Sequence, residues 1–370
     1  MLKEWKSPFL LMLVIVFSGF KPVQSQVTYI ALQNERLNIT PTEFYIHHID
    51  DERSDNTLIG ALLPVITDKG KLPEAYKVDF KGGIAAIKNF MEYSLPVDKT
   101  LRPLIIKLKA FIITESALGG GRVNGHINIS VSFGLLRDED FIPLGEYTGG
   151  AEYQRSAGTA QQTEPMLRST LSNTIVYINN WMNAQAGNNP KLAKNVVVNF
   201  ADYSEATEGD SIYYSVNRPL KWTDFEGTPR SSSKNGAEIF AGIGYDEDVA
   251  LKDGIFTITL SLKVYVPKSA CWVNSGSQNA YSLNHEQRHF DIAKLVGEHF
   301  KKNVATEHLP PDNYDGPINI LYLDALREMN KLQKQYDDET RHSINSYEQQ
   351  QWNKRIDKEL EELGIKTKID

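Results

Sequence analysis

Five consecutive residues, His285 to His289, spell the pattern HExxH, which brings two imidazoles and one carboxylate to a single point. Residues four apart lie on the same face of a helix, so His285 and His289 can bind one cation while Glu286 reaches a water bound to it. Zinc lowers the pKa of such a water to about 7, and a neighbouring carboxylate can pass its proton to a leaving amine. The pattern therefore predicts a zinc site with His285 and His289 as ligands and Glu286 as general base.

A helix must carry this motif. Ser282 or Asn284 is the expected cap at its start. Apolar residues recur at helical spacing after the motif and predict a buried face: Phe290, Ala293, Leu295, Val296 and Phe300. A structural zinc site needs four protein ligands, whereas a catalytic site uses three and leaves a position for water. A third ligand must therefore come from another part of the chain.

A second helical pattern leads to candidates for that ligand. Its apolar stripe consists of Tyr322, Leu326, Met329, Leu332 and Tyr336. Beyond it, we predict His342 as the third ligand, with Asp338 or Glu339 as a ligand instead or as the carboxylate that orients an imidazole. Tyr336 or Arg341 is the candidate for stabilising the oxyanion. A solvated surface turn is the alternative interpretation of these charged residues.

Strict alternation of apolar and polar residues predicts strands in two regions. Residues 106–112 and 123–133 form two half-buried strands joined by a glycine-rich hairpin turn at 119–121. A helix over 165–182 would cover one face of their sheet. Residues 256–266 alternate in the same way shortly before the metal helix. An exposed edge of this second sheet could hold an extended substrate, although the strand serves equally well as core scaffolding.

A shift in composition divides the chain. Residues 186–217 are rich in Asn, Gly, Asp, Glu and Ser, which indicates a linker region. The sequence therefore predicts an α+β fold with two domains: an N-terminal α+β domain of unknown role at 26–185 and a zincin-like α+β metallopeptidase domain at 218–345. Residues 346–370 are expected to form a C-terminal helical tail.

Residues 1–25 have the form of an export signal. Lys3 and Lys6 precede an apolar core at 9–17 that is too short to span a bilayer, and Ser25 suits a cleavage site. The alternative is an N-terminal membrane anchor that is retained. We expect a secreted or periplasmic protein with no stable membrane span after the signal is removed.

Composition limits the partners. The chain has 370 residues, of which 41% are hydrophobic and 24% charged, as in ordinary globular proteins. A net charge of -7 and scattered Lys and Arg residues leave no basic surface for phosphates, so nucleic acid is not an expected partner. The single cysteine, Cys271, cannot form an intramolecular disulfide and is expected to be a small buried apolar residue. A peptide or protein substrate is the expected partner, and the oligomeric state is left open.

Four segments together carry a resemblance to a known family. They are Pro219–Gly227 (PLKWTDFEG), Ala270–Val273 (ACWV), Leu283–Leu295 (LNHEQRHFDIAKL) and Tyr336–Ser343 (YDDETRHS). Through them the region from Pro219 to about Trp352 resembles the secreted zinc-dependent protease domain of bacteria, a family long classed as a domain of unknown function.

The resemblance implies roles for individual residues. It implies that His285, His289 and His342 are ligands and that Glu286 is the base. Arg288 stands where the family usually has Gly, and Ser343 likewise follows the last His where the family usually has Gly.

These observations predict an exported, zinc-dependent metallopeptidase that hydrolyses peptide bonds through a metal-activated water. Two alternatives belong to other classes. One is a non-catalytic envelope binding protein with a structural or vestigial metal site, and the other is a zinc amidase that acts on cell-wall amide bonds.

Overall fold

The computed structural model describes residues 27–64, 74–156, 158–230, 233 and 235–365. These residues form mixed α+β structure, and the chain divides into two compact units, Met1–Trp181 and Met182–Asp370. The expected signal peptide at 1–25 lies outside the described residues. Within the described part, no helix is both long and apolar enough to cross a membrane.

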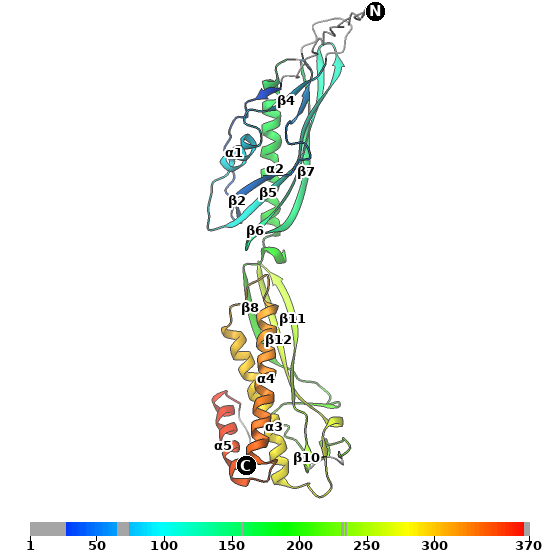
Figure 1. Ribbon diagram of the computed structural model, residues 1–370, viewed down its shortest axis with the longest axis vertical. Helices are drawn as coiled ribbons and strands as arrows, with labels where there is room; N and C mark the ends of the chain where they lie inside the picture. Colours follow the sequence, from blue (N-terminus) through cyan, green and yellow to red (C-terminus); the bar gives the residue numbers. More distant parts are fainter. Residues whose placement is uncertain (1–26, 65–73, 157, 231–232, 234, 366–370) are drawn as a thin grey trace, which may run out of the picture. The chain divides into compact units, whose positions relative to one another are not determined.

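The first unit is a mixed sheet with a long helix against it (Figure 1). Six strands follow one another in the order β1-β4-β3-β5-β6-β7, and β2 pairs with β5 beside this path. The strands are β1 (Thr28–Ile30), β2 (Phe44–Asp51), β3 (Gly60–Leu62), β4 (Tyr76–Phe80), β5 (Arg102–Gly119), β6 (Arg122–Arg137) and β7 (Asp140–Ser156). The helices are α1 (Ile84–Ser94), the 3-10 turn η1 (Ala160–Thr163) and α2 (Glu164–Gln185).

The expected elements of the first unit are confirmed. The strands predicted at 106–112 and 123–133 lie within β5 and β6, which pair antiparallel. The three glycines of the intervening turn all have positive φ, which glycine adopts without strain. The helix predicted at 165–182 is α2, and the Trp181 ring packs edge-on against Phe133 of β6 at 5.1 Å. Because of this contact, α2 covers one face of the sheet.

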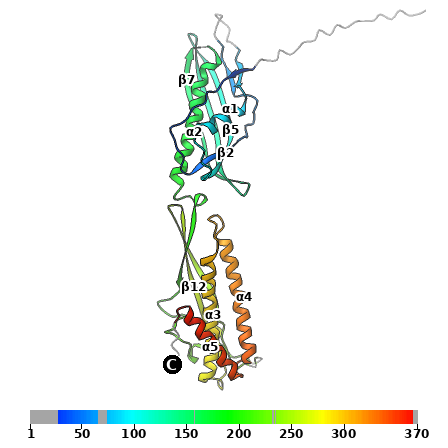
Figure 2. The same ribbon diagram turned by 90° about the vertical axis from the view of Figure 1, so that its left-hand side faces the viewer.

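The second unit is a four-stranded sheet packed against helices (Figure 2). Strand β12 lies at its centre, antiparallel to β11 and β9 and parallel to β8. The strands are β8 (Asn195–Asp202), β9 (Ser211–Tyr213), β11 (Gly242–Lys252) and β12 (Ile255–Pro267), and a separate pair is formed by β10 (Ala237–Glu238) and β13 (Trp272–Val273). The helices are α3 (Ala280–Thr306), α4 (Asp315–Thr340), α5 (Ser346–Glu362) and the 3-10 turns η2 (Pro190–Leu192), η3 (Trp222–Asp224) and η4 (Lys268–Ala270). Figure 2 shows α3 next to the sheet, α4 beyond it and α5 crossing both helices.

The stretch expected as a linker at 186–217 instead contributes β8 and β9 to this sheet. Its polar composition conceals an alternation in which Val196, Val198 and Phe200 pack against the core. A short strand needs only every second residue to be apolar, so a polar average composition is compatible with strands in this stretch.

The core of the second unit lies between β12 and α3. As the sequence predicts, six alternate side chains of β12 are buried, and all but Phe256 belong to this core: Phe256, Ile258, Leu260, Leu262, Val264 and Val266. Gly297 lets α3 approach the strand, because a Cβ at this position would lie 2.8 Å from Leu262 Cδ2. Cys271 is 1% exposed and belongs to the same core, which confirms its expected role.

The expected tail is a packed helix. Apolar residues of α5 form a second core cluster with residues of α3 and α4: Ile292, Leu295, Tyr336, Trp352, Ile356 and Leu360. The Trp352 indole also donates to Glu339 Oε2 at 2.7 Å. Helix α5 is therefore part of the unit that carries the HExxH motif.

Candidate metal centre

The HExxH motif lies near the start of α3. Asn279 caps this helix, because its side chain accepts a hydrogen bond from the Ser282 backbone N–H at 2.9 Å. The cap therefore comes earlier than the predicted Ser282 or Asn284. His285 and His289 lie one turn apart, with ring centroids separated by 4.9 Å and ring planes at 88°.

Asp337 of α4 brings a carboxylate to the two imidazoles. The Nε2 atoms of His285 and His289 lie 3.3 Å apart, and Asp337 Oδ1 lies 3.2 Å and 3.0 Å from them. Zinc ligands about 2.0–2.2 Å from the metal lie roughly 3.3–3.6 Å apart at tetrahedral angles. Two of the three separations are slightly shorter than this range, and the donor types are those of a zinc site, so the three atoms could hold one divalent cation after a small outward shift.

The local electrostatics favour a charged carboxylate at this point. Burial alone would raise the pKa of Asp337, but hydrogen bonds from His285 and His289 outweigh it and lower the pKa. The same carboxylate raises the pKa of His289 against the opposing effect of burial. Asp337 is thus available as an anionic ligand at neutral pH.

Glu286 lies beside this group but is not a member of it. It is 5% exposed and lines the same cleft. Burial raises the pKa of Glu286, and the two neighbouring histidines only partly oppose the effect. A carboxylate with a raised pKa holds a proton more readily, as a general base must.

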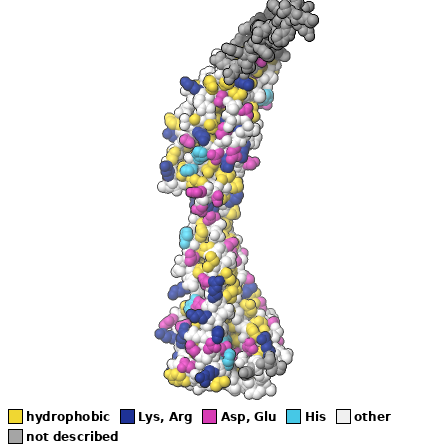
Figure 3. Space-filling view, viewed as in Figure 1, with side chains coloured by type: hydrophobic (Ala, Val, Ile, Leu, Met, Phe, Trp, Pro, Cys, Tyr) yellow, Lys and Arg dark blue, Asp and Glu magenta, His cyan; other side chains and the backbone are white. Residues whose placement is uncertain are grey.

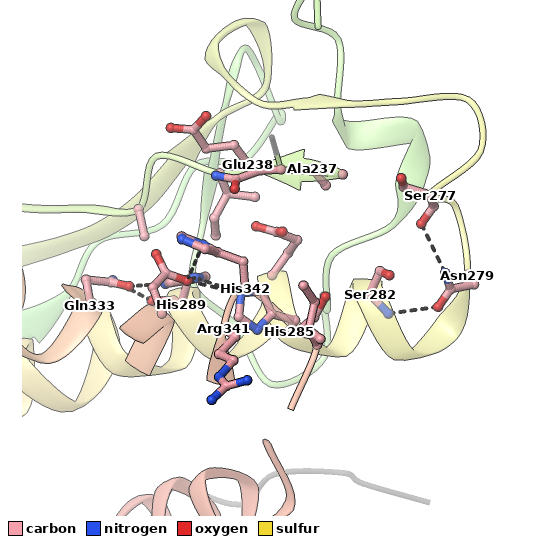
Figure 4. A pocket seen from close by; sticks show the side chains of 18 of the residues that line it. Ala237, Glu238, Ser277, Asn279, Ser282, His285, His289, Gln333, Arg341 and His342 are labelled. Carbon is pink, nitrogen blue, oxygen red and sulfur yellow. Dashed lines mark hydrogen bonds and ion pairs between the residues drawn. The ribbon is translucent and has the colours of Figure 1, made fainter. Parts of the chain in front are cut away.

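A cleft of about 870 Å³ opens over these residues. Helix α3 lines one side, and the segments 235–241 and 341–344 also line it. Figure 4 shows Ala237 and Glu238 across the cleft from His285, His289 and His342.

The structure separates the candidates for the third ligand. His342 is outside the group of three, although its Nδ1 lies 3.2 Å from Asp337 Oδ1. The side chain of Asp338 is exposed and pairs with Lys334, and Glu339 accepts from Trp352. Neither Asp338 nor Glu339 reaches the imidazoles. The carboxylate that faces them belongs to Asp337.

The two candidates for the oxyanion role lie in different surroundings. Tyr336 is fully buried, its ring stacks on His285 at 4.7 Å, and its hydroxyl lies 3.3 Å from the His285 carbonyl oxygen. Tyr336 packs against His285 and is not among the residues that line the cleft. Its position therefore does not suit the oxyanion role expected for it. Arg341 does line the cleft.

Sequence reasoning missed two glutamines that hold the imidazoles. Gln333 Oε1 contacts His289 Nδ1, and Gln333 Nε2 donates to the His289 carbonyl oxygen at 2.9 Å. Gln349 Oε1 lies 2.9 Å from His285 Nδ1. In metal sites, partners of this kind fix the tautomer and orientation of ligating histidines.

Comparisons with known proteins add little to this description. A scan against protein-family models finds no match, and a search of curated proteins finds no relative. Similar solved structures include a Xanthomonas campestris protein of the DUF330 family, with 11% identity and a TM-score of 0.28 over 44% of this chain and 98% of that one. A minor lipoprotein from Acinetobacter baumannii is 18% identical with a TM-score of 0.19, over 25% of this chain and 74% of that one. An uncharacterized protein is 8% identical with a TM-score of 0.24, over 41% of this chain and 98% of that one. TM-scores this low carry no argument, so the resemblance to the zinc-dependent protease family rests on the sequence segments alone.

Proposed function

We propose that the protein is a zinc-dependent metallopeptidase of zincin-like type. The observation that carries the proposal is the convergence of His285 Nε2, His289 Nε2 and Asp337 Oδ1 beside a buried Glu286. Three protein ligands leave one position of a tetrahedral zinc site open, as catalytic sites require.

In this proposal the two motif histidines and Asp337 hold the ion. When bound, zinc would lower the pKa of a water to about 7 and polarise a carbonyl oxygen. Glu286 would take a proton from that water on its carboxylate and deliver it to the leaving amine. The Ile239 backbone N–H forms a hydrogen bond with the Glu286 carboxylate, which holds it on the cleft side of α3.

A strand in the lining of the cleft supports an extended peptide as substrate. Segment 235–241 lines the cleft and contains β10, which pairs on one side with β13. A strand with an accessible edge can bind an extended chain through main-chain hydrogen bonds.

The distribution of charge agrees with a peptide rather than a nucleic acid. The chain carries a net charge of -7. On the face drawn in Figure 3, Lys and Arg side chains are interspersed with Asp and Glu. A mixed surface of this kind does not attract a phosphate backbone.

We also propose that the protein is exported, on the evidence of the N-terminal sequence. Lys3 and Lys6 before a short apolar core support this part of the proposal.

Elemental analysis and a peptide-cleavage screen of the purified protein test the proposal together. We expect about one zinc per chain, and a loss of most of it in His285→Ala and His289→Ala. His308→Ala, an exposed histidine beyond the end of α3, is the matched control. Equal zinc content in all four proteins would refute the metal site, and zinc without peptide cleavage would favour the binding-protein alternative.

A further inference from the structure

A second hollow, of about 370 Å³, lies in the first unit against strand β5. Phe111 and Ile113 of this strand are buried in the core. The residues that alternate with them line the hollow from the opposite face of the strand: Ala110, Ile112 and Thr114. Ile112 is 49% exposed there. A large apolar side chain that is open to solvent within a concave site favours a ligand with an apolar body.

The hollow lies where the pairing of β5 is interrupted. Strand β2 pairs with β5 only as far as Leu108, and β3 pairs with it from Ile113. The chain returns to β5 at Gly60, which has a φ of 141° and leaves no room for a side chain, because a Cβ would lie 2.0 Å from the Ile113 carbonyl oxygen. Residues 53–59 connect the two pairings, and most of them line the hollow.

Hydrogen bonds within this connection hold it in place. The Arg53 side chain is 3% exposed, and its Nε and Nη2 donate to the Asp51 carboxylate at 2.7 Å and 2.8 Å. The same guanidinium contacts the carbonyl oxygens of Asn56 and Leu58 at 3.4 Å. Leu58 lines the hollow. The hollow is therefore preformed, and a ligand pays little ordering entropy to enter it.

Lys77 of β4 places a cation at one end of the apolar surface. Ala61 pairs with Lys77 on one side and with Thr114 on the other. Side chains of directly paired residues lie on the same face of a sheet, so these residues form a row beside Ile112. Lys77 is exposed and lines the hollow, and within the described part of the chain it forms no ion pair.

The other cations around the hollow already have partners. Arg53 is held by Asp51, and Lys109 forms an ion pair with Glu52. Glu52 also pairs with Lys107 at 2.7 Å. The ammonium of a lysine outside these pairs is the one available to an anionic ligand.

Two further carboxyl groups belong to this part of the sheet, and neither makes a contact with Lys77. Asp55 lines the hollow but accepts from the N–H and the hydroxyl of Thr57, at 3.0 Å and 2.7 Å. Burial raises the pKa of Asp79, the second residue after Lys77, and so favours its uncharged form. The charge of Lys77 is thus not met by direct contact.

We propose that this hollow binds a medium-chain fatty acid. The carboxylate of the ligand pairs with Lys77, and its chain lies over Ile112 and Ala110 against Leu58. The volume is at the small end of the range of ~300–1,000 Å³ for ligand pockets, which suits a single short chain. The site belongs to the first unit, and the proposal does not depend on the metal centre.

The test follows the binding of decanoate to the full chain with ¹³C-labelled isoleucine methyl groups. We expect the Ile112 methyl signal to shift during a titration below the critical micelle concentration. Ile320 of the second unit is 60% exposed and is the internal control, whose signal should stay in place. An Ile112→Val variant assigns the signal. The uncharged 1-decanol should bind more weakly than decanoate.

Two variants address the charge and the space separately. Lys77→Gln should weaken decanoate binding about 2 to 5-fold, the range for an exposed ion pair, and leave 1-decanol unaffected. Lys99→Gln, an exposed lysine in the turn before β5, is its matched control. Ala110→Phe should fill the hollow and abolish the binding of both ligands. Its control is Ser116→Phe, at an exposed position of the same strand outside the hollow.

Three results would overturn the proposal: an Ile112 signal that decanoate does not move, equal weakening in the two lysine variants, or full binding in Ala110→Phe. The lysine pair, at the surface, decides the matter if Ala110→Phe does not fold. Tighter binding of an acetylated and amidated leucine tripeptide, which carries no charge, would identify the hollow as a peptide site instead.

Discussion

His342 Nδ1 lies 3.2 Å from Asp337 Oδ1, the same carboxylate oxygen that faces both imidazoles of the HExxH motif. The sequence predicts His342 as the third ligand, whereas the structure places Asp337 within the group of three. In the proposed metal site, His342 would contact the Asp337 carboxylate and would not itself bind the ion. Such an outer partner orients the carboxylate and is expected to matter less than the carboxylate itself.

Asp337→Ala should therefore weaken zinc binding more than His342→Ala does. We expect His342→Ala to lower the affinity by no more than about 10 to 100-fold, the range for loss of an outer partner, and Asp337→Ala to exceed it. Asp338→Ala is the matched control, because the Asp338 side chain is exposed and pairs with Lys334. Competition with a chelator of known affinity ranks the variants. A greater loss in His342→Ala would restore that residue as the third ligand.

Helical periodicity narrows the choice of carboxylate on α4 but does not settle it. Each residue of a helix turns by about 100°, so Gln333 and Asp337 lie beside the apolar stripe that ends at Tyr336, and Asp338 faces away from it. Asp338 and His342 do not share a helix face, because α4 ends at Thr340. A helical wheel therefore excludes Asp338, but it places Asp337 and Glu339 equally far from the centre of the stripe and does not choose between them.

Other parts of the centre could not be predicted in this way. The motif helix and the strand at 256–266 follow from local pattern alone. Gln349 lies 64 residues from His285 and meets it only because Trp352, Ile356 and Leu360 pack α5 against α3 and α4. No local pattern encodes that packing, so the sequence predicts only a tail for the C-terminal helix.

Ser343→Gly should stabilise the protein. Arg341, His342 and Ser343 all have positive φ, with 67° at Ser343. This conformation costs about 1–2 kcal/mol for a residue with a Cβ, and glycine avoids the cost but loses about 0.5–1 kcal/mol through backbone entropy. The free energy of unfolding by urea should therefore rise by roughly 0.5–1 kcal/mol. Ser346→Gly, in the first turn of α5, should lower it instead, and the idea fails if both variants lose stability equally.

The stability of the protein should fall at alkaline pH through Cys271. Burial raises the pKa of the Cys271 thiol from 9.0 to about 11. As the pH rises from 9.0 to about 11, the unfolded chain loses a proton that the folded chain keeps, so the free energy of unfolding decreases. Below pH 9.0 the thiol keeps its proton in both states and makes no such difference. Urea unfolding across this range should show a shallower decrease for Cys271→Ala than for the wild type, and parallel curves would contradict the assignment.

Glu286→Gln should abolish hydrolysis while leaving the metal in place. The side chain lies outside the group of three ligand atoms, so the variant should bind zinc as the wild type does. The amide cannot accept a proton, so cleavage should slow by about 10² to 10⁴-fold, the usual contribution of a general base. Mass spectrometry of a peptide library measures the cleavage, and elemental analysis measures the zinc.

The control for the loss of a carboxylate is Glu307→Gln. Glu307 is exposed and lies just beyond the C-terminus of the same helix, so this variant should cleave at the wild-type rate. If Glu286→Gln cleaves as fast as the control, Glu286 is not the base. If it loses the metal as well, Glu286 contributes to the ligand set and the division of roles along α3 is wrong.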